Sequence, residues 1–186
     1  MSQKFTVLFD LDGTLVDTAP DLMLAHNHVM KKFGYEERKL SDIKKLAGGG
    51  SKAMLRKSIH EIAELSGKIK KTNEKIEDKM TKEFIDFYSK NIANDSTLKN
   101  GLLNFLSWCK KKSISMAVCT NKQEHLSIDL LKKIKIYEFF DYVAGGNTFN
   151  YNKPDPRHLT GAIEIIGGEL KKSLMIGDSE TDSNSA

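Results

Sequence analysis

The sequence predicts a three-layer α/β fold, a doubly wound parallel sheet with an inserted α-helical domain. Short apolar runs alternate with helical patterns in the second half of the chain. That alternation favours a parallel sheet covered by helices on both faces. One further apolar run, residues 5–9, is separated from the others by helical patterns alone. We therefore expect a core of residues 1–15 and 91–186, and a helical cap of residues 16–90 inserted after the first strand.

Composition and charge are those of an ordinary globular protein. The chain has 186 residues, of which 39% are hydrophobic and 29% charged, and its formal net charge is +4. The lysines occur as scattered pairs and triplets, such as those at 31–32 and 110–112, without interleaved aromatic side chains. This pattern favours a solvated surface over a nucleic-acid interface. A mild positive field would still attract a small anionic substrate.

Cysteine usage and the first residues indicate a cytoplasmic protein. Cys109 and Cys119 form no CxxC pair, and each lies in an apolar segment, which is typical of buried thiols in a reducing compartment. The first apolar run is too short for a signal peptide and ends in carboxylates. No apolar stretch approaches the length of a membrane span. We expect a monomer or homodimer that contacts neither a membrane nor nucleic acid.

The insertion is expected to be a bundle of four amphipathic helices. The first begins near Thr18, because Pro20 suits the first turn of a helix, and it ends at Gly34. A short second helix runs from Ser41 to the glycines at 48–50, and two longer helices follow. The apolar side chains of these helices recur at helical spacing. They include Leu22, Ala25, Val29, Met54, Leu55, Ile59, Ile76, Met80 and Phe84.

The second half of the chain is expected to supply three more strands, at 114–119, 141–144 and 173–177. Each is an apolar run bounded by polar or turn residues. Helical patterns precede or separate them, with apolar positions at Leu102, Leu106, Cys109, Leu126, Leu130, Leu159, Ala162 and Ile163. Trp108 is expected to lie in the core beside these positions.

Polar side chains follow several of the predicted strands at their carboxyl ends. Asp10 and Asp12 follow the first strand, Thr120 and Asn121 the second, and Asp178 the last. Ligands of open α/β sheets bind at this edge, so residues far apart in sequence are expected to meet there. Two further charged residues complete the set: Lys153, after the third strand, and Asp182, one helical turn beyond Asp178.

This set of residues is suited to phosphoryl transfer. Carboxylates gathered at one place are hard oxygen ligands for Mg²⁺, and the metal offsets their mutual repulsion. One carboxylate can attack phosphorus, while a hydroxyl, an amide and an ammonium hold the other phosphate oxygens. Asp10 and Asp12 are two residues apart and can divide the work, one as nucleophile and one as proton donor.

Four short stretches of the sequence resemble the motifs of a known superfamily. FDLDGTLVDT, VCTNK, NKPDP and GDSETD occur in this order. Together they resemble the four motifs of the haloacid dehalogenase superfamily, which implies a Rossmann-like core with an inserted cap. The second aspartate, Asp12, resembles that of the phosphatase-type members, because the dehalogenases proper do not carry it.

The resemblance also implies catalytic roles for single residues. Asp10 would be the nucleophile and Asp12 the general acid and base. Thr120, together with Asn121, would bind the phosphate, and Lys153 would steady the nucleophile and the phosphate.

The same resemblance implies a magnesium site. Mg²⁺ would be bound by Asp10, by the backbone carbonyl of Asp12 and by Asp178, while Asp182 would support the metal shell or pair with Lys153.

Within the superfamily, the sequence most resembles the bacterial phosphoglycolate phosphatases. The stretches GGNTFNYNKPDPRHL and LAGGGSKAML add to the likeness, which covers nearly the whole chain. It implies a small phosphate ester, 2-phosphoglycolate first, as substrate. It also implies that cap residues Gly50 and Ser51, with Lys52 or Lys57, face the substrate carboxylate.

Other functions are compatible with parts of this pattern. A sugar phosphomutase is built on the same motifs, and a phosphate-responsive receiver module also carries an Asp, a Thr and a Lys at a sheet edge. Members of the superfamily continue beyond the position of Asp182 with a helix, a strand and a tail, whereas this sequence ends at Ala186. We therefore also expect an apolar sheet edge without its outer neighbour, and an inactive fragment remains a further alternative.

Overall fold

A computed structural model describes residues 5–66 and 73–186 of the chain. The chain divides into two compact units. Met1–Asp17 and Thr97–Ala186 form the first, which we call the sheet unit, and Thr18–Ser96 form the second, which we call the helical unit. Within the described residues, no helix is both long and apolar enough to cross a membrane.

The sheet unit is built on four parallel strands in the order β5-β4-β1-β6. Their bounds are β1 Thr6–Phe9, β4 Ser115–Cys119, β5 Tyr142–Ala144 and β6 Ser173–Ile176. From β1 the chain continues to β4 and then β5 on one side, whereas β6 lies on the other side of β1. The carboxyl ends of β1 and β6 therefore flank the point where ligands bind in open α/β sheets.

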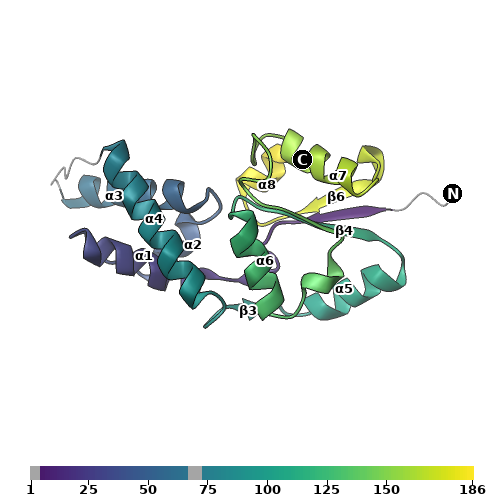
Figure 1. Ribbon diagram of the computed structural model, residues 1–186, viewed down its shortest axis with the longest axis horizontal. Coiled ribbons are helices and arrows are strands. Elements are labelled where there is room, and N and C mark those ends of the chain that lie inside the picture. Colours follow the sequence, from purple (N-terminus) through teal and green to yellow (C-terminus); the bar gives the residue numbers. More distant parts are fainter. Residues whose placement is uncertain (1–4, 67–72) are drawn as a thin grey trace. The chain divides into compact units, whose positions relative to one another are not determined.

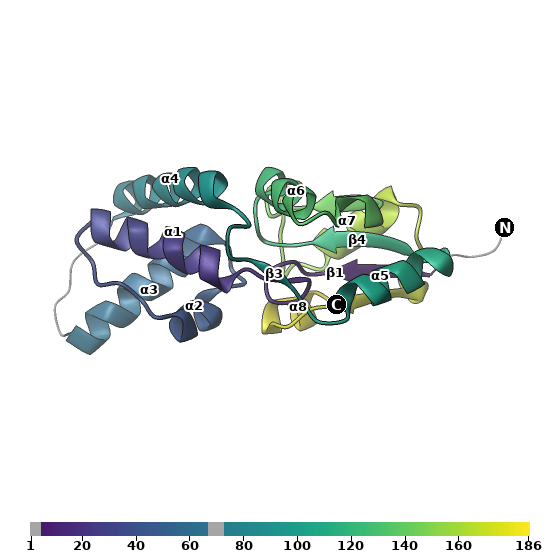
Figure 2. The ribbon, with the colours of Figure 1, turned by 90° about the horizontal axis from the view of Figure 1, so that it is seen from below.

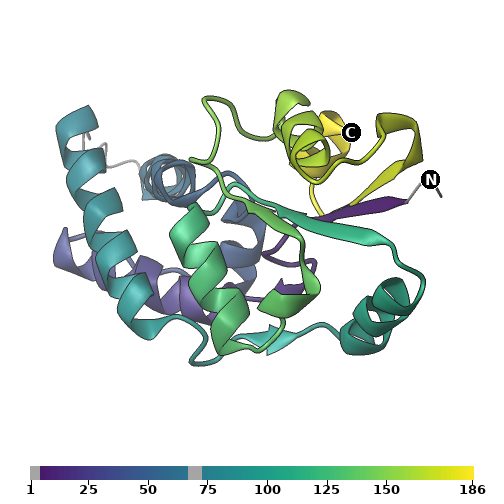
Figure 3. The same ribbon diagram turned by 45° about the vertical axis from the view of Figure 1, so that its right-hand side comes forward.

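Helices cover both faces of this sheet, so the predicted three-layer α/β fold is confirmed. Helices α5 and α6 lie on one face, and α7 and α8 lie on the other (Figures 1 and 3). Their bounds are α5 Leu102–Lys111, α6 Glu124–Lys133, α7 Arg157–Ile165 and α8 Glu180–Ser185. Two 3₁₀ turns, Tyr137–Phe139 and Leu170–Lys172, precede β5 and β6. The core beneath α7 consists of Leu8, Ala117, Cys119, Ala144, Leu159, Ala162 and Ile163.

The prediction that Trp108 lies in the core is wrong. Its side chain is 49% exposed, and its ring stacks on that of Phe105 at a centroid distance of 6.0 Å. The buried face of α5 is set by Leu102, Leu106 and Cys109, which recur at helical spacing. Trp108 precedes Cys109 by one residue and is therefore turned away from that face.

The helical unit consists of α1 Ala19–Lys32, α2 Leu40–Leu46, α3 Ser51–Ser66 and α4 Glu74–Asn91. Helices α1 and α4 pack side by side (Figure 2). Among the described residues, its buried side chains include Val29, Met30, Ile43, Leu46, Met54, Met80, Phe84 and Tyr88. The four expected helices are therefore present, with apolar faces that pack on one another.

A buried carboxylate fastens the two ends of the helical unit together. Asp21, in the first turn of α1, accepts hydrogen bonds from the backbone N–H groups of Asp95 (2.9 Å) and Ser96 (3.0 Å). The Ser96 hydroxyl donates to the same carboxylate at 2.5 Å. Because hydrogen bonds to a charged acceptor are strong, these contacts fix the chain where it enters and leaves the unit.

Two very short strands stand at the ends of the sheet unit's two segments. β2, Val16–Asp17, pairs with β3, Thr97–Leu98, in antiparallel register. Two residues are too few to show a periodic pattern, so neither strand was predicted. This pair joins the two segments of the sheet unit, directly before the chain enters the helical unit and directly after it leaves. Along the chain, the boundaries between the two units fall between residues 17 and 18 and between residues 96 and 97. The role of the helical unit as a cap remains a prediction.

Candidate active site

The turn after β1 places Gly13 against the carboxylate of Asp178, a residue distant in the sequence. Asp10 follows the strand directly, and its backbone N–H donates to the Ile176 carbonyl of β6 at 2.9 Å. Gly13 has a φ of +90°, and a Cβ atom there would lie 2.2 Å from Oδ2 of Asp178. Thr14 donates its hydroxyl proton to Oδ1 of Asp178 at 3.0 Å. The DGT sequence is therefore needed for close approach between the loops after β1 and β6.

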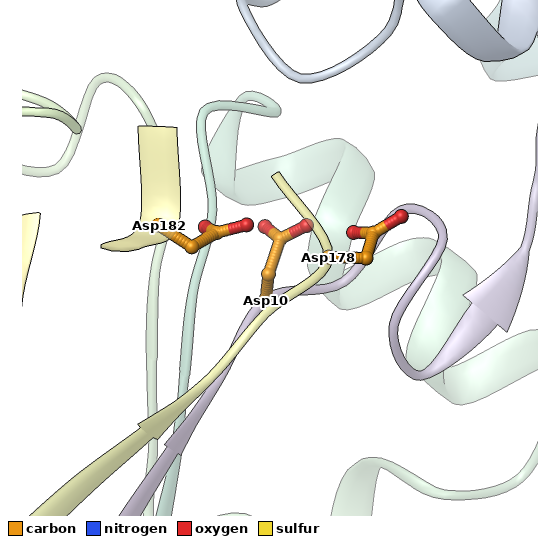
Figure 4. Close-up of side chains that lie close together, drawn as sticks. All are labelled: Asp10, Asp178 and Asp182. Carbon is orange, nitrogen blue, oxygen red and sulfur yellow. The ribbon is translucent and has the colours of Figure 1, made fainter. Parts of the chain in front are cut away.

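Three carboxylates converge at this end of the sheet. Asp10, Asp178 and Asp182 each offer an oxygen atom, and these atoms all lie within 4.8 Å of one another. In Figure 4 the carboxylate of Asp10 lies between those of Asp182 and Asp178. Like charges at such short range repel unless a cation or a shared proton relieves them.

Lys153 supplies one of the relieving charges. Its Nζ lies 2.7 Å from Oδ1 of Asp10 and 2.5 Å from Oδ1 of Asp182, and its side chain is only 2% exposed. Asp182 also caps the start of α8, where its Oδ2 accepts hydrogen bonds from the backbone N–H (3.0 Å) and the hydroxyl (2.6 Å) of Ser179. Lys153 thus joins the loop after β5 to the ends of β1 and β6.

Burial and charge shift the pKa values of this cluster in opposite directions. Burial raises the pKa of Asp10 to about 6, although the Lys153 ammonium acts against this rise. Burial also acts on Asp182, but hydrogen bonds from Lys153 and Ser179 outweigh it and lower the pKa of that carboxyl. The pKa of Lys153 is raised, because the two carboxylates outweigh its own desolvation. Asp182 and Lys153 therefore form a stable ion pair beside a more basic Asp10.

Asp12 is held by a lysine that the sequence analysis did not single out. Nζ of Lys122 lies 2.8 Å from Oδ1 and 2.9 Å from Oδ2 of Asp12. Lys122 is two residues beyond Thr120, within the VCTNK stretch, so the motif contained it. Its role depends on a contact between residues 110 positions apart, which no local pattern reveals.

The predicted phosphate-binding pair sits at the end of β4. Thr120 is buried, and its hydroxyl oxygen accepts a hydrogen bond from the backbone N–H of Lys122 at 3.2 Å. The Asn121 side chain donates from Nδ2 to the Lys153 carbonyl at 2.9 Å. Asn121 therefore fixes the loop that carries Lys153. Phosphate binding by Thr120 and Asn121 remains a prediction.

The predicted cap residues belong to the helical unit. Gly50 has a φ of +82°, and its carbonyl accepts a hydrogen bond from the N–H of Met54 at 3.0 Å, so it leads into α3, which begins at Ser51. Lys57 is exposed on α3, whereas Lys52 pairs with Asp78 of α4 at 2.6 Å. Contact of Gly50, Ser51 and Lys57 with a substrate carboxylate remains a prediction.

The residues at the sheet edge fit a divalent cation. When ionised, three carboxylates and one ammonium leave an excess of two negative charges, and all the acidic ligand atoms are hard oxygens. Lys153 contacts one oxygen of Asp10 and one of Asp182, and in Figure 4 Asp182 and Asp178 lie on opposite sides of Asp10. Asp10 and Asp178 are the pair best placed to share an ion, while Asp182 is engaged by Lys153 and Ser179.

Comparison with known proteins agrees with this geometry. A model of the family described as haloacid dehalogenase-like hydrolase matches residues 7–186. A phosphoglycolate phosphatase of Mesorhizobium japonicum is 34% identical over 180 residues, which are 97% of this chain and 77% of that protein. The phosphoglycolate phosphatase of Agrobacterium fabrum is 35% identical over 177 residues, covering 94% of this chain and 72% of that protein.

A solved structure shows the same fold over the whole chain. The crystal structure of a predicted phosphoglycolate phosphatase from Haemophilus somnus superimposes with a TM-score of 0.89 at 26% identity, covering 100% of this chain and 81% of that one. The family resemblance of the four motifs is thereby confirmed. The chain belongs to the haloacid dehalogenase-like hydrolase family and is an enzyme similar to phosphoglycolate phosphatases.

Proposed function

We propose that this protein is a Mg²⁺-dependent phosphatase that hydrolyses a small phosphate monoester, 2-phosphoglycolate first, through an aspartyl-phosphate on Asp10. The observation that carries the proposal is the convergence of Asp10, Asp178, Asp182 and Lys153 at the carboxyl ends of β1, β6 and the loop after β5. The relatives named phosphoglycolate phosphatase support the choice of substrate.

Asp10 is suited to act as the nucleophile. Its side chain is 8% exposed, and Lys153 holds one of its oxygens, so the other oxygen has a fixed direction. In the first step this oxygen forms a bond to phosphorus while the bond from phosphorus to the ester oxygen breaks. The Lys153 ammonium offsets negative charge that gathers on the phosphoryl oxygens.

Asp12 is proposed to move the protons. It gives a proton to the departing ester oxygen, and it then takes one from the water that hydrolyses the aspartyl-phosphate. It lies two residues after Asp10, on the turn closed by hydrogen bonds from the N–H groups of Leu15 and Val16 to the Leu11 carbonyl, so the two carboxylates belong to one loop.

A divalent cation would be held by Asp10, Asp178 and the backbone carbonyl of Asp12, with Asp182 in support. Such an ion supplies charge neutralisation between the carboxylates and the incoming phosphate. The Thr120 hydroxyl, at the end of β4, is proposed to bind a phosphate oxygen. Asn121 is proposed to contribute by holding the Lys153 loop.

The direct test is a phosphate-release assay over a panel of small phosphate esters, first with Mg²⁺ and then with a chelator. We expect release from 2-phosphoglycolate without any added bisphosphate, and loss of release when the chelator is present. A requirement for a bisphosphate, with the phosphoryl group returned to a sugar, would instead indicate a phosphomutase. Release that continues unchanged in excess chelator would contradict the metal-dependent mechanism.

A matched pair of variants refines this metal test. Asp178→Asn removes a proposed ligand charge, so half-maximal activity should require at least about 10-fold more Mg²⁺, the lower end of the effect seen for groups that merely support a metal ligand. Asp129→Asn changes an exposed carboxylate on α6 and should leave the Mg²⁺ requirement unchanged. Equal Mg²⁺ requirements for the two variants would show that Asp178 is not a ligand of the metal.

A further inference from the structure

The strongest contact that the proposed mechanism leaves unused is the one between Lys122 and Asp12. The ammonium lies within 2.9 Å of both carboxylate oxygens, and the two side chains are only 6% and 14% exposed. Surface ion pairs hold their geometry loosely, whereas a pair removed from water is held closely. Lys122 therefore fixes the plane and the position of the Asp12 carboxylate.

The backbone beneath Lys122 is itself fixed. Its carbonyl accepts a hydrogen bond from the N–H of Gly146 at 2.8 Å, and its own N–H donates to the Thr120 hydroxyl at 3.2 Å. A Cβ atom at Gly145 would lie 2.8 Å from the Lys122 carbonyl oxygen, and one at Gly146 would lie 2.5 Å from that of Asn121. The loop after β5 therefore packs directly on the segment that carries this lysine.

The site assigns a different lysine to each of the two aspartates of the DLD sequence. Lys153 contacts Asp10 and Asp182, whereas Lys122 contacts Asp12. Both lysines follow strands that lie on the same side of β1, and Asn121 ties the two segments together through the Lys153 carbonyl. The nucleophile and the proposed acid and base are thus positioned separately.

We propose that Lys122 is a positioning residue that acts through Asp12 and aims its carboxyl group at the ester oxygen. This inference rests on the proposed function. An ammonium has three N–H donors, so Lys122 can keep one Asp12 oxygen while the other faces the ester oxygen. As the bond from phosphorus to the ester oxygen breaks, the proton passes from Asp12 to that oxygen. A proton from the attacking water later restores Asp12.

The leaving group of the substrate distinguishes this role from a merely structural one. An alkyl ester such as 2-phosphoglycolate needs a proton on its departing oxygen, whereas the departing oxygen of p-nitrophenyl phosphate is stable as an anion. We expect Lys122→Met to lower the rate constant for phosphorylation of Asp10 by 2-phosphoglycolate, measured in a single turnover, by about 100-fold, within the range of a general-acid contribution. For p-nitrophenyl phosphate the same rate constant should fall by no more than roughly 3-fold, whereas hydrolysis of the aspartyl-phosphate, in which Asp12 acts as base, should slow for both substrates.

A double-mutant cycle tests whether Lys122 acts through Asp12. Once Asp12→Asn has removed the acid, adding Lys122→Met should lower kcat for 2-phosphoglycolate by less than about 3-fold, because residues that act as a unit are not additive. Lys122→Arg keeps the charge and the donors and should recover part of the lost rate. Lys110→Met changes an exposed lysine on α5 and should leave both substrates unaffected.

The outcomes separate this inference from the proposed function. If the wild-type protein releases phosphate from neither substrate, the proposed function fails and the inference fails with it. If the wild type is active but Lys122→Met slows the phosphorylation of Asp10 equally for both substrates, Lys122 does not act through Asp12. The same holds if Lys122→Met adds its full loss to that of Asp12→Asn. Should the methionine variant not fold, the arginine variant decides. Its smaller loss in the rate of Asp10 phosphorylation must again be greater for 2-phosphoglycolate than for p-nitrophenyl phosphate.

Discussion

Asp10→Asn is expected to abolish phosphate release, with kcat reduced by at least about 10⁴-fold, as for other enzymes that lose their nucleophile. The amide of asparagine has nearly the shape of the carboxylate but cannot form the bond to phosphorus. The fold should survive, because the replacement removes one charge from a buried cluster in which burial raises the pKa of Asp10 to about 6. The measurement is steady-state phosphate release at saturating Mg²⁺, together with the thermal midpoint of unfolding.

Asp129→Asn serves as the control for the same chemical change at an exposed position on α6. It should match the wild-type protein in both measurements. An Asp10→Asn protein that turns over at the wild-type rate would show that another group attacks phosphorus.

Lys153→Met is expected to cost both stability and activity. The side chain is 2% exposed and lies between Asp10 and Asp182, so its removal leaves two carboxylates without their shared cation. Breaking a buried ion pair in this way destabilises a protein by about 3–5 kcal/mol. Activity should be lost as well, because the proposed nucleophile is no longer oriented. Urea unfolding at an unchanged m-value measures the first effect, and phosphate release measures the second.

Two further variants show whether the loss comes from unpaired charge. Adding Asp182→Asn to Lys153→Met removes one stranded carboxylate and should restore part of the stability but none of the activity. Lys172→Met breaks a more exposed pair with Glu169, at 3.5 Å, and should change stability by less than about 1 kcal/mol. If the double variant is no more stable than Lys153→Met, the charge explanation is wrong.

The strands and helices of the sheet unit could be predicted because each has a strong local pattern. β4 is a run of apolar residues, and the apolar positions of α7 recur at helical spacing with Ala162 and Ile163 buried. The strands β2 and β3 could not be predicted, because each has only two residues and is a strand only through its pairing with the other. The prediction for Trp108 was wrong because this residue is apolar but lies off the helix face that Leu102, Leu106 and Cys109 define.

The residues gathered at the sheet edge could be predicted because topology decides that parallel strands end together. Asp10, Asp178 and Asp182 meet for that reason, although more than 160 positions separate the first from the others. Side-chain partners could not be predicted in the same way. The reach of Lys122 to Asp12, and of the Asn121 amide to the Lys153 carbonyl, depends on how the loops after β4 and β5 pack.

Trapping of the phosphorylated protein tests the central claim most directly. In the Asp12→Asn variant, Asp10 should attack p-nitrophenyl phosphate normally and release p-nitrophenolate. The base that activates water is missing, so the covalent species should accumulate. After an acid quench, peptide mass spectrometry is predicted to find one phosphoryl group on Asp10, and hydroxylamine, which cleaves acyl phosphates, should remove it. A phosphoryl group on any other residue, or turnover by this variant with Asp10 never modified, would contradict the account.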